Sequence, residues 1–208
     1  MKSILFFIFF LCCSCSIVGI QDVEEPEYEI LSTSDEVEIR QYKSYCTAET
    51  TVKGSYKDAQ SQGFRILAAY IFGDNLAKEK IAMTAPVSRK KESTQIAMTA
   101  PVLIAKKEES WIITFTMPAK YNLEDLPKPL DKRISLKKKP AKTLAVLGFS
   151  GFATEENVEY YKDHLSRWLK KSSSLYIKMS SAVVAGYNPP WTLPFLRRNE
   201  IMYEVRKK

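Results

Sequence analysis

The 208-residue chain contains a single histidine, His164, and only seven glycines. It shows no Ser-His-Asp set, no paired carboxylates, no metal-ligand spacing and no glycine-rich phosphate loop. These are the patterns by which hydrolases, metalloenzymes and nucleotide-dependent enzymes are usually found. The sequence therefore gives little support to a catalytic function, and we predict a protein that is not an enzyme.

Cysteine is also scarce in the part of the chain that we expect to fold. Three of the four cysteines lie within the first 15 residues, which leaves Cys46 alone in the rest of the chain. One cysteine forms no internal disulfide, so the domain must be held by its core. Cys46 is either a catalytic thiol or a buried side chain, and the separation from His164, on a predicted helix, favours the buried side chain.

The apolar run at the amino terminus, Ile4–Leu11, is too short to span a bilayer. With Lys2 before it and Cys12-Cys13-Ser14-Cys15 after it, the run has the layout of a secretory signal. Ser14-Cys15 resembles a bacterial lipobox, although Cys12 stands where leucine is usual. We predict a signal peptide over residues 1–14, a lipid-anchored Cys15 with an acidic linker over 15–26, and a folded domain over 27–208.

This prediction places the protein outside the cytoplasm, anchored by lipid to a bacterial membrane and facing the periplasm or the exterior. Plain secretion and an uncleaved anchor are the alternatives.

The composition, 45% hydrophobic and 26% charged, is ordinary for one globular domain. The net charge is +7, but the basic residues are spread along the chain in short runs that are typical of solvated loops. We do not expect nucleic-acid binding, because no basic helix or aromatic-basic module accompanies these runs. The runs are Arg89–Lys91, Lys106–Lys107, Lys137–Lys139, Lys170–Lys171 and Lys207–Lys208.

The heptapeptide Ile-Ala-Met-Thr-Ala-Pro-Val occurs twice, at Ile81–Val87 and Ile96–Val102. In each copy the larger apolar residues alternate with smaller or polar ones, which predicts a half-buried strand with Met83 or Met98 facing inward. The charged connection between the copies predicts that they are antiparallel neighbours.

Periodicity elsewhere predicts an α+β fold. In Glu36–Tyr42 the alternation places Val37 and Ile39 inward, and Glu38 and Arg40 outward. The two halves of the chain share one order of strands, helix and strands, which suggests a pseudo-two-fold repeat with helices packed on a curved antiparallel sheet or barrel. The further strands are predicted over 45–54, 111–118, 134–136, 143–149, 175–186 and 200–205, and the helices over 56–72 and 155–171, the second with Thr154 as N-cap.

The first predicted helix has two apolar stripes, Ala59-Gly63-Ile66-Tyr70 and Phe64-Leu67-Ala68-Ile71. A helix with two apolar stripes needs two covers. The sheet is one cover, and a loop or a ligand is the other.

The segment Tyr187–Glu200 is rich in proline yet carries Tyr187, Trp191, Leu193, Phe195 and Leu196 on what must be a surface loop. Such a loop covers something apolar, either the spare helix stripe or a bound ligand, and the arginines at its end can meet carboxylates. Alternatively, Trp191 and Phe195 fill a small satellite core and one arginine pairs with Glu200.

Several further segments accompany the doubled heptapeptide, namely Gly73-Asp-Asn, Glu79-Lys80, Phe115-Thr-Met-Pro, Leu147-Gly-Phe-Ser-Gly, Gly186-Tyr-Asn-Pro-Pro-Trp and Arg197-Arg-Asn-Glu. Together with the heptapeptide they resemble the SOUL haem-binding protein family, from about Glu27 to the carboxyl terminus. The resemblance implies a distorted antiparallel β-barrel flanked by two helices and related to bacterial effector-sensor domains. It also implies affinity for haem or another tetrapyrrole in a groove between the first helix and the proline-rich loop.

Carried over to this sequence, the groove lies between Ala59–Tyr70 and Tyr187–Phe195. A porphyrin needs apolar walls and cations for its propionates. The predicted tetrapyrrole-binding residues are Ala59, Gly63, Arg65, Ile66, Tyr70, Tyr187, Trp191, Phe195, Arg197 and Arg198.

The sequence provides no obvious ligand for haem iron. Some family members use a histidine near the second strand, but that region here is Tyr42-Lys-Ser-Tyr-Cys-Thr. His164 is either an iron ligand or a residue at the solvent edge of the second helix, and we favour the latter. We predict tetrapyrrole binding without strong axial ligation, with a sensor-like binder of another flat apolar or cationic molecule as the alternative.

Overall fold

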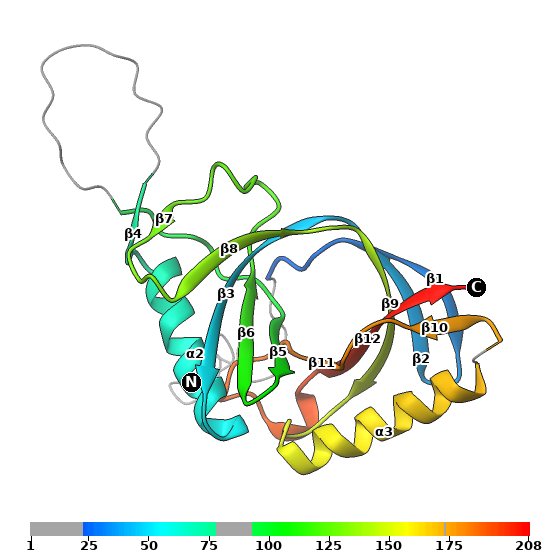
Figure 1. Ribbon diagram of the computed structural model, residues 1–208. Helices are drawn as coiled ribbons and strands as arrows, with labels where there is room; N and C mark the ends of the chain where they lie inside the picture. Colours follow the sequence, from blue (N-terminus) through cyan, green and yellow to red (C-terminus); the bar gives the residue numbers. More distant parts are fainter. Residues whose placement is uncertain (1–22, 78–92, 173) are drawn as a thin grey trace, which may run out of the picture.

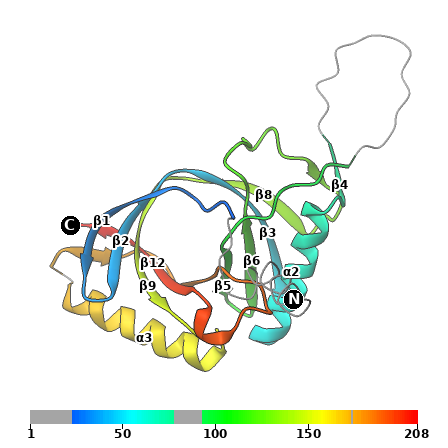
Figure 2. The same ribbon diagram turned by 180° about the vertical axis from the view of Figure 1, so that it is seen from behind.

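The computed structural model describes residues 23–77, 93–172 and 174–208, and in this part of the chain it shows an α+β fold (Figure 1). A ten-stranded antiparallel sheet curves around itself, and two long helices lie outside the curve (Figure 2). No helix within these ranges is long and apolar enough to cross a membrane.

The first half of the chain contributes β1 (Tyr28–Ser34), β2 (Val37–Tyr42), β3 (Tyr45–Lys53), α2 (Tyr56–Ile71), β4 (Asn75–Leu76), β5 (Val102–Lys107) and β6 (Ser110–Thr116). The second half contributes β7 (Lys128–Pro129), β8 (Ile134–Lys139), β9 (Lys142–Phe149), α3 (Glu155–Lys171), β10 (Tyr176–Lys178), β11 (Val183–Gly186), the 3-10 turn η1 (Pro194–Leu196) and β12 (Asn199–Lys207).

The sheet is open, so the predicted barrel is wrong in this respect. Its strand order is β1-β2-β9-β12-β11-β5-β6-β3-β8, with β10 added on β12. A barrel closes only when its end strands pair. Here β1 and β8 are the two ends of the path, and they do not pair in the described chain.

The strand order confirms a repeat of two similar halves. Exchanging β2 with β8, β3 with β9, β5 with β11 and β6 with β12 gives the same order from β2 to β8, read from the opposite end, so every strand keeps equivalent neighbours. The halves also exchange strands, because β2 pairs with β9 and β8 pairs with β3. The pair β5–β11 lies at the centre of this arrangement.

Alternation along the strands gives the sheet two different faces. The face that carries α2 and α3, here called the helix face, buries the main apolar core, including Ile39, Ala48, Ile113, Leu147 and Ile201. The opposite face, here called the concave face, carries polar and charged side chains together with a smaller apolar cluster around Tyr42, Val146 and Met202.

The two helices begin and end close to the predicted positions. Ser55 caps α2 by accepting a hydrogen bond from the Asp58 backbone, and Thr154 caps α3 in the same way from Asn157. Within α2, Gly63 faces the sheet so closely that a Cβ atom there would lie 2.1 Å from the Ile113 side chain. Glycine therefore sets the approach of α2 to β6.

The prediction for the repeated heptapeptide is wrong where the structure tests it. The first copy lies outside the described residues, as does Met83. The second copy is irregular until β5 begins at Val102, and Met98 is 41% exposed. Its backbone bonds to other segments, with Ile96 donating to Ile71 and Ala100 donating to Glu24, so the alternation buries Ile96 and Ala100 without a strand.

Three further differences concern strands. Strand β1 was not predicted, because its residues are mostly exposed and therefore carry no burial pattern. The strand predicted over 175–186 is split into β10 and β11. Arg40, predicted to point outward, is 6% exposed because the concave face of β2 is covered as well.

Candidate functional site

A groove of about 900 Å³ lies on the helix face of the sheet. Helix α2 packs against β3 and β6, whereas α3 packs against β9, β10 and β12. The central strands β5 and β11 therefore lie between the areas that the two helices cover. Their apolar side chains Val102, Ile104 and Val184 form the floor of the groove, together with Gly186.

Three segments form the walls. Helix α2, as far as Arg65, contributes Lys57, Gln60, Ser61, Phe64 and Arg65. The opposite wall is the segment from Phe152 to Glu155, which leads into α3. The third wall is the proline-rich loop between β11 and β12, through Asn188, Pro190 and Arg197.

Polar contacts hold the proline-rich loop in place. The Arg197 guanidinium donates to the Thr192 carbonyl oxygen at 2.9 Å and also to the Pro190 carbonyl, and it lies 4.6 Å from the centre of the Phe152 ring. The Gly151 backbone donates to the Pro194 carbonyl at 2.9 Å. These contacts do not involve the large apolar side chains of the loop itself. The loop therefore keeps its shape while its own apolar side chains face solvent.

Trp191 is 64% exposed and Phe195 is 70% exposed, and neither side chain is among the residues that line the groove. The alternative in which they fill a satellite core is therefore wrong. Leu193 and Phe152 are also exposed, at 41% and 51%. Apolar groups gathered on a surface mark a site of contact with a ligand, a membrane or another protein.

The predicted site residues of α2 separate into two groups. Arg65 is exposed and lines the groove. Ala59, Gly63, Ile66 and Tyr70 are buried against the sheet, and the Tyr70 hydroxyl donates to the Pro127 carbonyl at 2.9 Å. These four side chains therefore support the helix that forms the wall, and Phe64 lies on the groove side in their place.

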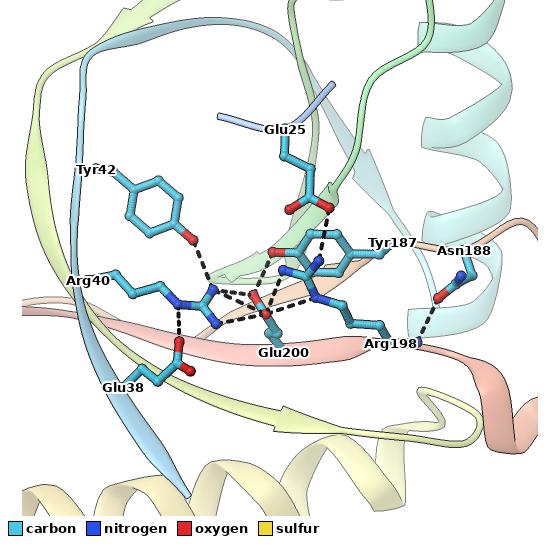
Figure 3. A network of polar contacts seen from close by, with 8 residues as sticks. All are labelled: Glu25, Glu38, Arg40, Tyr42, Tyr187, Asn188, Arg198 and Glu200. Carbon is cyan, nitrogen blue, oxygen red and sulfur yellow. Dashed lines mark hydrogen bonds and ion pairs between the residues drawn. The ribbon is translucent and has the colours of Figure 1, made fainter. Parts of the chain in front are cut away.

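The predicted residues of the loop also separate. Arg197 lines the groove, whereas Tyr187 and Arg198 turn to the concave face and join a buried network around Glu200 (Figure 3). Arg40 Nη1 lies 3.1 Å from each Glu200 carboxylate oxygen, and Arg198 Nη2 lies 3.0 Å from Oε1. The Tyr187 hydroxyl donates to Glu200 Oε2 at 2.5 Å.

Burial determines how the charges and protons of this network are arranged. Glu200 is 2% exposed, so its charge requires partners, and two guanidinium groups provide them. Burial and the neighbouring Glu200 carboxylate raise the pKa of Tyr187 far above its usual range, so its hydroxyl stays protonated and acts as a donor. The pairing of one arginine with Glu200, one of the two alternatives that the sequence left open, is confirmed for Arg198. Arg40, 160 positions away from Glu200, was missed.

Two residues with reactive side chains lie away from the groove. Cys46 is buried on the helix face of β3, and burial raises the pKa of its thiol, which confirms the interpretation as a buried side chain. His164 lies nine residues after Glu155 on α3, which is about 13 Å along the helix axis. The described residues contain no group of three or more histidine, cysteine or acidic residues that could hold a metal ion.

Comparisons with known proteins agree with this fold. The family model described as SOUL heme-binding protein matches residues 23–204. Human Heme-binding protein 2 is 28% identical over 171 residues, which cover 82% of this chain and 78% of the human protein.

Two solved structures show the same fold at low identity. The EcmrR C-terminal domain has a TM-score of 0.54 and 12% identity, over 87% of this chain and 99% of that domain. An uncharacterized conserved protein from Listeria innocua has a TM-score of 0.51 and 9% identity, over 82% of this chain and 92% of its own.

Proposed function

The chain belongs to the SOUL heme-binding protein family, and on this premise we propose that its helix-face groove binds haem or a related tetrapyrrole without catalysing a reaction. The observation that carries the proposal is a groove with an apolar floor on β5 and β11, beside a loop with exposed aromatic side chains. A volume of about 900 Å³ lies within the range of small-molecule sites, roughly 300–1,000 Å³.

The charges around the groove favour an anionic ligand. Three cationic residues line it, Lys57, Arg65 and Arg197, against one carboxylate, Glu155. The two propionates of a porphyrin match this surplus, because charge-assisted hydrogen bonds to carboxylates are strong. The same surplus disfavours the alternative of a cationic apolar ligand, which would need an acidic groove.

The groove offers few side chains that could act as axial ligands of haem iron. Of its described lining residues, only Tyr56 is of a type that ligates haem iron. Burial raises the pKa of Tyr56 to about 12, so the phenol stays protonated at neutral pH. Its hydroxyl is buried and has no hydrogen-bond partner among the described residues. We therefore propose that the tetrapyrrole is held by its plane and its propionates rather than by an axial ligand.

Replacing both Trp191 and Phe195 by alanine tests the proposal. The double variant should bind hemin about tenfold or more weakly, because a buried aromatic face contributes more than the ~1.4 kcal/mol that corresponds to tenfold. The measurement is an absorption titration at the Soret band. Its matched control is Phe72→Ala with Leu31→Ala, which removes two side chains that are 60% and 52% exposed but belong neither to the groove nor to the proline-rich loop beside it.

The control should bind hemin as the wild type does, and both variants should unfold near the wild-type midpoint. Unchanged hemin affinity in the Trp191/Phe195 variant would contradict the assignment of the groove.

We further propose that the protein is exported and held at a bacterial membrane by a lipid on Cys15, with secretion as the alternative. Cys15 lies outside the described residues, and the proposal rests on the signal-like sequence before it. A labelled fatty acid should be incorporated into the wild type, which should fractionate with membranes, and not into Cys15→Ser. Label retained by Cys15→Ser would contradict it. Nucleic acid is not a proposed partner, because the basic residues do not gather on one helix.

A further inference from the structure

The concave face contains a second cavity of about 200 Å³, separate from the groove. Both sites use strands β5 and β11, but from opposite sides of the sheet. Ile104 and Val184 line the groove, while the neighbouring Leu103 and Val183 line the cavity. Because successive residues of a strand point to opposite faces, a ligand in one site is separated from the other by the sheet itself.

The walls of this cavity combine an apolar surface with several lysines. Leu103, Ile112, Leu144, Val183 and Met202 provide the apolar part. Lys137 and Lys139 enter from β8, and Lys142 enters from the start of β9. Two carboxylates, Glu49 and Glu204, also line the cavity. Three ammonium groups and two carboxylates leave one positive charge in excess.

Glu49 is already neutralised by two lysines. Its side chain is 5% exposed, Lys137 Nζ lies 2.7 Å from Oε2, and Lys139 pairs with Oε1. Burial alone would raise the pKa of Glu49, but the hydrogen bonds from Lys137 and Lys139 hold the pKa below its usual value. Glu49 is therefore ionised, and the second lysine beside it exceeds what its charge requires.

Lys142 is the cation with the weakest pairing. Its side chain is 23% exposed, and its Nζ lies 3.9 Å from Glu204 Oε2, which is longer than a hydrogen bond. Burial and the nearby Lys139 lower the pKa of Lys142, while Glu204 opposes this shift. A partly buried ammonium group with a distant partner would gain from an anion that approaches through the cavity.

The size of the cavity limits what can enter. About 200 Å³ is less than the roughly 300 Å³ at which sites for drug-sized ligands begin, so a tetrapyrrole does not fit. At about 30 Å³ for each water molecule in the liquid, the space corresponds to about seven waters. A short alkyl chain with one charged head has this size.

We propose that the concave cavity binds a small monoanion with an apolar body, such as a medium-chain carboxylate. Its carboxylate lies between Lys139 and Lys142, and its chain packs against Leu103, Leu144 and Met202. The single positive charge in excess selects a monoanion, and the apolar wall selects an alkyl chain over an inorganic ion. This site is independent of the groove and of the ligand proposed there.

Calorimetric titration of the protein with sodium octanoate tests this site. We expect one octanoate per chain and much weaker binding of octanol, which lacks the charge. Lys142→Gln should weaken octanoate binding about tenfold or more, as expected for the loss of one charge-assisted hydrogen bond. The matched control is Lys138→Gln, which removes an exposed lysine from the same strand as Lys137 and Lys139 but outside the cavity, and should leave the affinity unchanged.

Hemin at saturation should not displace octanoate. Displacement by hemin would mean that octanoate binds in the groove and not in the concave cavity. Equal loss of octanoate affinity in Lys142→Gln and Lys138→Gln would mean that the affinity depends on the general surface charge. Either result, or no saturable binding at millimolar octanoate, would overturn the proposal. If Lys142→Gln does not fold, as judged by circular dichroism, Ala105→Phe replaces it, since a larger side chain at this cavity-lining position should block octanoate and leave hemin binding intact.

Discussion

Glu200 connects the proline-rich loop to the rest of the sheet. Tyr187 stands where the loop begins and Arg198 where it ends, and both contact the same buried carboxylate. Arg40 reaches this carboxylate from β2, on the other half of the repeat. The two ends of the loop are therefore fixed by one acid, which lets the loop hold its exposed aromatic side chains without a core of its own.

Replacing Glu200 by glutamine should destabilise the protein strongly. The substitution leaves two guanidinium groups near a neutral amide, and removing one partner of a buried ion pair costs about 3–5 kcal/mol. Urea unfolding followed by circular dichroism measures the loss. Glu204→Gln is the matched control, because that side chain lies on the same strand, is 43% exposed and meets Lys142 only at 3.9 Å. Equal midpoints for the two variants would show that the network contributes little.

For single residues, ion pairs between neighbours in the sequence could be predicted, whereas ion pairs between distant residues could not. The pairing of an arginine with Glu200 could be considered because Arg198 is two residues away. Nothing near Arg40 in the sequence indicates a carboxylate 160 positions later, and its place in an alternating strand predicted exposure. Only the curvature of the sheet, which covers the concave face, brings the two together.

Among the elements, the helices were predicted well because their signals are local. The N-cap Thr154 of α3 was predicted from the sequence, and so was the 3.6-residue apolar period of both helices, whereas the N-cap Ser55 of α2 was not. The repeated heptapeptide failed for the opposite reason. Alternation predicts which side chains are buried, and it does so for Ile96 and Ala100, but pairing with a neighbouring strand depends on distant residues.

The close packing of α2 on the sheet predicts that adding a side chain at Gly63 destabilises the protein. A methyl group there would meet Ile113 well inside van der Waals contact, and overpacking costs about 1–3 kcal/mol. The gain in helix propensity from glycine to alanine, about 1 kcal/mol, offsets part of this cost. Gly63→Ala should therefore lower the free energy of unfolding, whereas Gln62→Ala, at an exposed position of the same helix, should change it by less than about 0.5 kcal/mol. A Gly63→Ala variant as stable as wild type would mean that α2 can move away from β6.

For the whole molecule, the repeat explains why a groove exists. Each half places its helix over two strands, α2 over β3 and β6, and α3 over β9 and β12. The central pair β5–β11 belongs to both halves and lies between the covered areas. Its helix face is apolar because it continues the core, so the groove floor follows from the symmetry of the sheet.

The order of the two helices and of most of the longer strands was visible in the sequence, and the family resemblance indicated both the loop and the first helix. The sequence did not show which side of α2 faces the groove, because both of its stripes are apolar. The structure places Ala59 and Gly63 against the sheet and Phe64 and Arg65 at the groove. A choice between two apolar stripes depends on the neighbouring strands, which periodicity does not identify.

The position of bound hemin tests most directly whether the helix-face groove is the tetrapyrrole-binding site. Iron in hemin is paramagnetic and broadens nearby amide signals in a ¹⁵N-labelled protein, so an NMR titration maps where it sits. We predict that signals fade along α2 from Tyr56 to Arg65 and along the loop from Asn188 to Arg197, while those around His164 and on β8 remain. Broadening centred on His164 or on the concave face, with α2 and the loop unaffected, would contradict it.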